Sequence, residues 1–136
     1  MGIEPFLIAS TVNIAIGQRL IRKLCEHCKT SYAVTEEERH AFSGLIKNDH
    51  FASVTRMWKA DGCVTCNHMG YVKRIGIYEV LEVTEPIRRL IMRRASADEI
   101  HATALHEGMT SMFEDGFKKA AQGITSLAEL LRVIHN

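Results

Sequence analysis

The 136-residue sequence predicts an α+β protein whose middle part is held together by a metal ion. Strand-forming residues dominate two segments, 12–20 and 70–83. The last third repeats apolar residues at helical spacing. The four cysteines form two Cys-x-x-Cys pairs. With 46% hydrophobic and 24% charged residues, the composition is that of a globular protein and excludes disordered, collagen-like and coiled-coil chains.

The charge balance and the hydropathy pattern exclude further classes. Seventeen Lys and Arg against 16 Asp and Glu give a net charge of +1, so we expect no nucleic-acid partner. No apolar run reaches the roughly 20 residues that a membrane span needs. Residues 1–16 lack the basic start and cleavage site of a secretory signal peptide. We therefore expect a cytoplasmic protein, in which cysteines bind metals or do redox chemistry rather than form disulfides.

The N-terminal segment is expected to form a short helix followed by a strand. Pro5 suits the first turn of a helix, where its missing N–H costs nothing. Val12, Ile14 and Ile16 then alternate with other residues, which is the period of a strand. A continued helix that uses Ala9 on the same face remains an open alternative.

The segment between the two cysteine pairs contains a predicted helix and a predicted strand. Thr35 and Glu38 form a capping box, which predicts a helix over residues 36–47. Residues 55–59 fit a short strand. We therefore expect this segment to be an ordered insert rather than a long loop.

A strand or hairpin is predicted over residues 70–83, which are rich in β-branched and aromatic side chains. Glu79 falls on the same face of this segment as Ile77. A carboxylate among apolar neighbours is costly unless it has a partner. We expect Arg19 or Arg74 to pair with Glu79.

A small helical bundle is predicted for residues 84–136. Apolar residues at helical spacing run from Met109 to Gly123, a residue suited to the end of a helix. Ser or Thr residues mark the start of the other helices. These start signals are Thr84 with Pro86, Ser96 with Glu99, and Ser126 with Glu129.

The two cysteine pairs predict a closed zinc site. A gap of two residues lets both thiolates of a pair point at one ion, and two such turns supply the four sulfurs that zinc prefers. The softness of thiolates favours zinc over calcium or magnesium. Because all four cysteines are used, no coordination position stays open and the site is structural. The predicted ligands are Cys25, Cys28, Cys63 and Cys66.

Other interpretations of the cysteines remain open: a thioredoxin-like redox pair, an iron–sulfur centre, or thiols that pack without metal. His27 and His68 stand beside the cysteines and could replace a ligand, although we expect them to be solvated or to support the ligands. No phosphate-binding Gly-x-x-x-x-Gly-Lys-Ser/Thr stretch, no Gly-x-Gly-x-x-Gly and no defensible acid–base pair is present. We therefore predict no catalytic and no cofactor-binding residues within this chain.

Basic residues cluster within the first predicted helix of the bundle. They spread around most of its circumference, away from the apolar side, which is typical of a solvated face. A surface for a protein partner is the alternative. The residues are Arg88, Arg89, Arg93 and Arg94.

Several segments carry motifs of one known family. They are Gly2-Ile3-Glu4-Pro5-Phe6, Gln18-Arg19-Leu20 with Cys25-x-x-Cys28, Gly62-Cys63-x-x-Cys66, and Gly70-Tyr71 through Arg74-Ile75-Gly76-Ile77-Tyr78-Glu79. In this order they resemble the C-terminal part of the type II secretion and type IV pilus assembly ATPases, and the resemblance covers nearly the whole chain.

The resemblance implies a motor protein. Members of this family form cytoplasmic hexameric rings at the bacterial inner membrane, where they are held through their partners. ATP and Mg²⁺ bind a RecA-like domain, and turnover moves an inner-membrane platform protein that extrudes pilin or pseudopilin subunits. Cys25, Cys28, Cys63 and Cys66 match the family's zinc ligands, and Gln18 and Arg19 match an element that closes the RecA-like core.

The same resemblance implies four segments. They are the tail of the RecA-like core (1–24), a zinc-binding subdomain (25–70), a strand or hairpin returning to the core (71–83) and a helical subdomain (84–136). Because the nucleotide motifs lie upstream in the family, we expect this chain to be a C-terminal fragment that has no ATPase activity alone. Lys73 departs from the family's usual Gly-Tyr-x-Gly-Arg, in which glycine permits a positive φ, and this puts the family's turn in doubt.

Two functions of other classes compete with the motor hypothesis. A free-standing zinc adaptor that binds another protein would start at Met1 and fold as a monomer. A thiol oxidoreductase would need an exposed thiolate of low pKa. Tight binding of about one zinc ion per chain would exclude the oxidoreductase.

Overall fold

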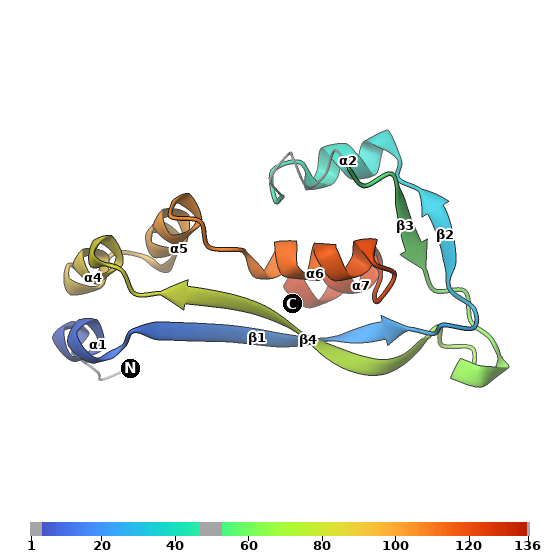
Figure 1. Cartoon of the computed structure of the whole chain (residues 1–136), viewed down its shortest axis with the longest axis horizontal. Helices are drawn as coiled ribbons and strands as arrows, with labels where there is room; N and C mark the ends of the chain where they lie inside the picture. The colour runs from blue at the N-terminus through green and yellow to red at the C-terminus, as the bar shows by residue number, and fades with distance from the viewer. Residues whose placement is uncertain (1–3, 47–52, 136) are drawn as a thin grey trace. The chain divides into compact units, whose positions relative to one another are not determined.

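The computed structural model describes residues 4–46 and 53–135. It contains helices and two two-stranded sheets, which confirms the predicted α+β class. Strands β1 (Ile14–Leu24) and β4 (Tyr71–Glu82) lie side by side and antiparallel in the longer sheet (Figure 1). The chain divides into two compact units, and both long strands continue from one unit into the other. The first unit is Met1–Gly17 with Tyr78–Ser111, and the second is Gln18–Ile77 with Met112–Asn136.

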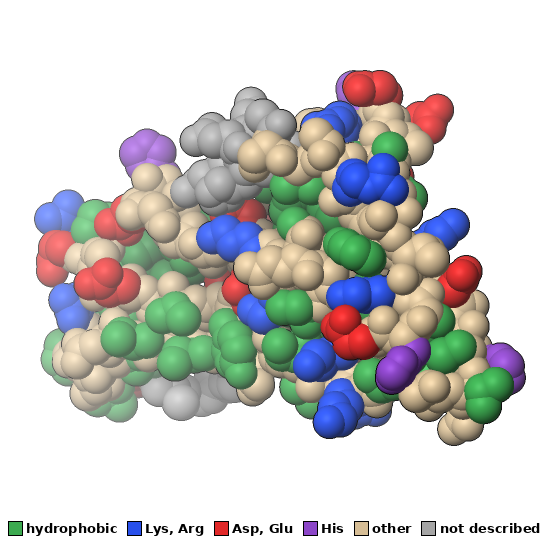
Figure 2. Space-filling view, turned by 45° about the vertical axis from the view of Figure 1, so that its right-hand side comes forward, with side chains coloured by type: hydrophobic (Ala, Val, Ile, Leu, Met, Phe, Trp, Pro, Cys, Tyr) green, Lys and Arg blue, Asp and Glu red, His purple; other side chains and the backbone are tan. Residues whose placement is uncertain are grey.

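The described ranges 4–46 and 53–135 include no helix that is both long and apolar enough to cross a bilayer. Large hydrophobic side chains are exposed on both long strands. Figure 2 shows hydrophobic side chains at the surface of one face of the molecule. Ile14 and Ile16, whose alternation predicted the strand, are 57% and 66% exposed. The period of β1 is therefore as predicted, but it does not mark a buried face.

Three helices make up most of the first unit: α1 (Pro5–Thr11), α4 (Glu85–Met92) and α5 (Ala97–His106). Helix α1 begins at Pro5 as predicted, and the strand interpretation of the residues after it is confirmed. Helix α4 packs against α1 and α5. Their shared core is Val83, Ile87, Leu90 and Ala104.

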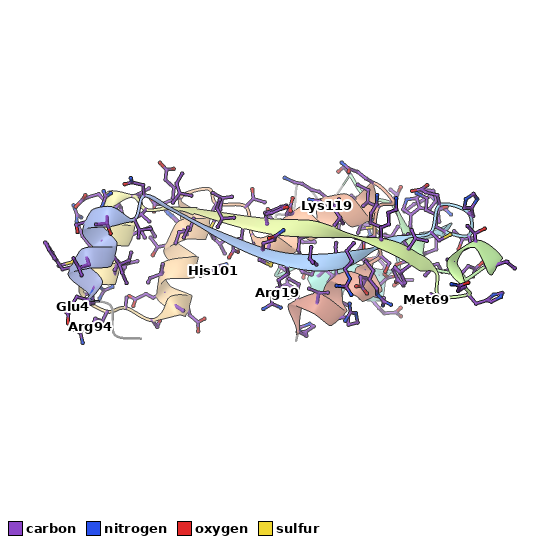
Figure 3. All side chains as sticks on the ribbon, turned by 90° about the horizontal axis from the view of Figure 1, so that it is seen from below. Glu4, Arg19, Met69, Arg94, His101 and Lys119 are labelled. Carbon is purple, nitrogen blue, oxygen red and sulfur yellow. The ribbon has the colours of Figure 1, made fainter. Side chains whose placement is uncertain are left out.

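The basic face of α4 is only partly solvated. Arg88 is half-buried, and its Nε donates to the carbonyl of Ala9 at 2.8 Å. Its Nη2 reaches Asn13 Oδ1 at 3.3 Å. Arg94 Nη2 lies 3.9 Å from Glu4 Oε2 at the other end of the same helix pair (Figure 3). The prediction of a solvated face is therefore wrong for Arg88, which ties α4 to α1.

Glu79 has a partner that the sequence did not indicate. The structure places His101 Nε2 at 3.0 Å from Glu79 Oε1, a contact that comes in addition to the predicted pairing with Arg19 or Arg74. His101 lies on α5, within the same unit as this part of β4. The cost of placing a carboxylate on this strand is thus offset by a residue 22 positions further along the chain.

The second unit contains the short hairpin of β2 (Thr30–Ala33) and β3 (Arg56–Lys59), with Thr30 opposite Lys59. The capping box predicted from Thr35 and Glu38 is present at the start of α2 (Glu36–Phe42). Helix α2 ends earlier than the predicted residue 47, which lies outside the described residues. Ser43 bonds back to a carbonyl of the last turn, and the glycine after it disfavours a continued helix.

Strand β4 runs without interruption from Tyr71, so the hairpin alternative for residues 70–83 is wrong. Lys73 lies in this regular strand and does not have a positive φ. The left-handed residues come just before the strand, at Asn67, His68 and Gly70. The turn of this chain therefore needs no glycine at position 73.

Helices α6 (Met112–Ala121) and α7 (Leu127–Ile134) pack on each other and on β3. Ser126 caps α7 by accepting from the N–H of Glu129, as predicted. Phe117 and Leu130 are almost fully buried at the centre of the larger core. The helices of residues 84–136 are thus divided, with α4 and α5 in the first unit and α6 and α7 in the second.

Gly116 allows α6 and α7 to approach closely. A Cβ atom at this position would lie 2.3 Å from Leu130 Cδ1. We expect Gly116→Ala to lower the free energy of unfolding by about 1–3 kcal/mol, because overpacking outweighs the gain in helix propensity. Urea denaturation measures this change. Gly44→Ala is the control, since a Cβ there meets nothing within 4 Å, and an equal effect of both substitutions would contradict the packing argument.

Candidate metal centre

Two turns bring the four cysteines together. The first follows the end of β1 at Leu24 and carries Cys25 and Cys28. The second is built on η1 (Val64–Cys66) and carries Cys63 and Cys66. We call these two turns, residues 25–28 and 63–66, the cysteine knuckle. Strand β1 ends just before its first turn, and β4 begins a few residues after its second turn.

The four sulfur atoms lie within 4.8 Å of one another. The Cys25–Cys63 and Cys28–Cys66 separations are both 3.8 Å, and the Cys63–Cys66 separation is 3.7 Å. These distances are far longer than the S–S bond of about 2.05 Å, so the cysteines are free thiols. The cluster could hold a metal ion, because all four sulfurs face a common point.

Backbone N–H groups are directed at the sulfurs. Gly62 donates to Cys28 Sγ at 3.2 Å, and the N–H groups of Cys63 and Gly70 donate to Cys66 Sγ at the same distance. Gly70 has φ +81°, and a Cβ there would lie 2.5 Å from that of Ala60. A larger residue at position 70 would clash with Ala60, so glycine is required there. The N–H of Gly70 stabilises a thiolate at Cys66.

The thiols differ in how readily they ionise. Burial opposes ionisation of Cys66, but the N–H donors of Cys63 and Gly70 outweigh it and lower its pKa to about 6. Burial raises the pKa of Cys28 to about 11, against the opposing bond from Gly62. A cation at the centre would favour the thiolate at all four positions, because metal ligation requires deprotonated sulfur.

The knuckle is anchored to the turn between α6 and α7. Lys29 Nζ donates to the carbonyl of Gly123 at 3.0 Å and lies 4.7 Å from the centroid of the Trp58 ring. The N–H of Leu24 donates to the carbonyl of Ile124 at 2.8 Å. Unfolding of the knuckle would therefore also disturb the core that packs against α6 and α7.

Near the knuckle, Glu129 on α7 forms a buried ionic centre. Its Oε2 accepts from Arg22 Nε at 3.1 Å and Nη2 at 2.8 Å. Arg132 donates to the same carboxylate at 3.0 and 2.6 Å. The side chain of Glu129 is 0% exposed, whereas those of Arg22 and Arg132 are 37% and 51% exposed. The two guanidiniums thus cover a single buried charge.

The ionic centre of Glu129 makes the stability of the folded state depend on pH. Burial acts to raise the pKa of Glu129, but the hydrogen bonds from Arg132 and Arg22 outweigh it and hold the pKa at about 2, against an ordinary 4.5. A lowered pKa stabilises the folded state at pH values above 4.5, and this contribution is lost as the pH falls towards 2. The shift corresponds to about 3 kcal/mol.

We therefore expect the difference in unfolding free energy between the unmodified chain and Glu129→Gln to shrink by about 3 kcal/mol on acidification. Urea denaturation at successive pH values between 4.5 and 2 measures it. The comparison uses the pH values at which both proteins still unfold cooperatively, because acid protonates the cysteines and releases the metal from both. A difference that stays constant with pH would contradict the assigned role of Glu129.

The structure places the other predicted residues as follows. His27 and His68 are exposed, and neither belongs to the group of potential ligands among the described residues. Arg19 donates to the carbonyl of Val133 and lies beside the C-terminal helix (Figure 3). The sequence indicated Glu129 only as part of a capping box, and no local signal points to its pairing with Arg22, 107 positions away.

Comparison with known proteins identifies the family. Residues 1–132 match the family described as Type II/IV secretion system protein. The chain is 42% identical over 135 residues to the type II secretion system ATPase E of Vibrio cholerae and 40% identical over 133 residues to the type IV pilus assembly ATPase PilB of Acinetobacter baylyi. Each match covers 98% of this chain, and 25% and 23% of those relatives.

A third relative is the protein transport protein HofB homolog of Escherichia coli, at 35% identity over 134 residues, which are 98% of this chain and 27% of that protein. The chain therefore spans about a quarter of the length of the curated relatives it matches. The match to the family extends over both cysteine pairs and both structural units. On this evidence the chain belongs to the Type II/IV secretion system protein family.

Proposed function

We propose that Cys25, Cys28, Cys63 and Cys66 bind one structural zinc ion. Four sulfurs at 2.3 Å from a tetrahedral zinc ion are separated from one another by about 3.8 Å. The sulfur separations of 3.7 and 3.8 Å in the cysteine knuckle fit this geometry. Because four thiolates fill the tetrahedron, the ion would have no open position for substrate. Its effect is to fasten the end of β1 to the start of β4.

We infer that the chain serves as the C-terminal, zinc-stabilised part of a type II secretion or type IV pilus assembly ATPase. The relatives are ATPases of these machines by name, and the match covers nearly all of this chain. In the whole protein, a RecA-like core would bind ATP and Mg²⁺, six copies would form a ring, and an inner-membrane platform protein would be the partner. The protein would then lie on the cytoplasmic side of the membrane, held there by its partners.

Within such a protein we propose a structural part for this chain. Residues 1–24 and 71–83 would complete the RecA-like core, residues 25–70 would form the zinc-binding subdomain, and residues 84–136 would provide a contact surface. The single observation that carries the proposal is the convergence of four cysteine sulfurs within 4.8 Å in a chain that matches the family over residues 1–132.

The purified chain is expected to hydrolyse no ATP above background, because its sequence holds no phosphate-binding loop. A phosphate-release assay on zinc-loaded protein measures this. The coding DNA upstream of Met1 tests the rest of the proposal: an in-frame Gly-x-x-x-x-Gly-Lys-Thr motif supports the motor. A stop codon there, with a folded monomer, would favour a free-standing zinc adaptor instead. Turnover that survives further purification would contradict the structural role.

A further inference from the structure

A concave pocket of about 440 Å³ in the second unit is dominated by arginine side chains. Two come from β1, one from β4 and one from α7, so segments more than 50 residues apart converge on it. The lining residues are Arg19, Leu20, Arg22, Arg74, Arg132 and Val133. Neither the predicted zinc site nor the family match assigns any ligand to this place.

Two of the arginines are held in fixed orientations. Arg22 and Arg132 each donate through Nε and Nη2 to the buried carboxylate of Glu129. The guanidinium of Arg22 also lies 4.3 Å from the centroid of the Tyr71 ring, which restricts it further. Ordering these long side chains beforehand removes an entropic cost that a ligand would otherwise have to offset.

The other two arginines complete the wall. Arg19 is held by the carbonyl of Val133, and the side chain of Arg74 is exposed on β4. Four guanidiniums therefore line one pocket, and Arg22 and Arg132 share the carboxylate of Glu129. Glu129 orders these two side chains from the protein side of the pocket.

We propose that this pocket binds linked phosphate groups. A guanidinium pairs with phosphate oxygens through two parallel hydrogen bonds, and several guanidiniums around one cavity suit an anion with several charges. A ligand with a single carboxylate offers only two acceptor oxygens to these four side chains. Pyrophosphate carries at least two charges and several oxygens, so it can accept hydrogen bonds from more than one guanidinium at once. This inference is independent of the zinc site and of the proposed motor function.

Isothermal titration of the zinc-loaded chain with sodium pyrophosphate, at fixed ionic strength, tests the proposal. Arg74→Gln removes one wall residue and leaves the contacts of Glu129 intact. We expect it to weaken binding about tenfold, the loss of one charge-assisted bond. Lys73→Gln is the matched control: it removes a cation from the adjacent position of the same strand, where the side chain points to the opposite face.

Binding that is retained in Lys73→Gln and weakened in Arg74→Gln supports the site. ATP serves as a second probe for the source of the phosphates. Equal affinity for ATP and pyrophosphate assigns recognition to the phosphates alone, and tighter binding of ATP that also depends on Arg74 assigns it to a nucleotide. Equal weakening by both substitutions would show that binding depends only on the overall charge of the protein, and it would overturn the proposal. Absence of saturable binding of pyrophosphate would overturn it as well.

Discussion

Replacing Cys25 with serine is expected to abolish tight zinc binding and to unfold the second unit. The substitution removes one of the four sulfurs and buries a hydroxyl in the knuckle, since Cys25 is only 1% exposed. Structural zinc in small modules contributes on the order of 10 kcal/mol or more, which is comparable with the whole stability of a domain. Thermal unfolding followed by near-UV circular dichroism, with and without added zinc, measures the change.

His27→Ser is the control for this experiment. His27 lies in the same turn, is exposed and is not among the potential metal ligands of the described residues. We expect its melting temperature to stay close to that of the unmodified chain. A cooperative transition in Cys25→Ser at the unmodified temperature would mean that the second unit is stable without the metal.

The second large effect is expected from Glu129→Ala. The change leaves Arg22 and Arg132 without the carboxylate that both of them bind, and it opens a cavity beneath α7. Removal of one partner from a buried ion pair costs about 3–5 kcal/mol. Urea denaturation at neutral pH, with zinc present throughout, measures the loss of unfolding free energy.

Glu26→Ala provides the comparison. Glu26 also pairs with a cation, Lys29, at 3.0 Å, but its side chain is 71% exposed. Exposed pairs contribute at most about 1 kcal/mol. If both substitutions cost the same, the Glu129 centre would be no more than a surface ion pair, and the structural account of the second unit would be wrong.

The sequence was most informative where the cause of a structure is local. The capping box of Thr35 and Glu38 predicted the start of α2, because both bonds close within four residues. The spacing of Cys25 and Cys28 predicted a turn with two converging sulfurs for the same reason. The extent of α2 was predicted less well, since residues 43 and 44 stop it before the apolar pattern ends.

Features that depend on distant residues were not predictable from one sequence. Glu79 needed a partner, but nothing local in the sequence points to His101, 22 positions further along the chain. Glu129 carries the signature of a helix start, and only the fold brings Arg22 to it. The division of the C-terminal helices between two units has the same origin, because helical spacing shows which face is apolar and not what covers it.

The structure also connects the cysteine knuckle with the rest of the second unit. The N–H of Cys25 donates to the carbonyl of Gly70 at 2.9 Å, which joins the two strands where they enter the knuckle. Gly123, where Lys29 binds, precedes the segment that carries Thr125 and Ser126, both buried. Tyr71 and Ser126 then share a hydrogen bond of 2.6 Å. An ion at the knuckle would therefore stabilise strands and helices together.

The most direct test of the central claim is the zinc content of the purified chain, measured together with the reactivity of its thiols. We predict about one zinc ion per chain, with all four cysteines protected from alkylation until a chelator removes the metal. A chain that contains no metal after purification with zinc present, and whose four thiols all react without a chelator, would contradict the claim.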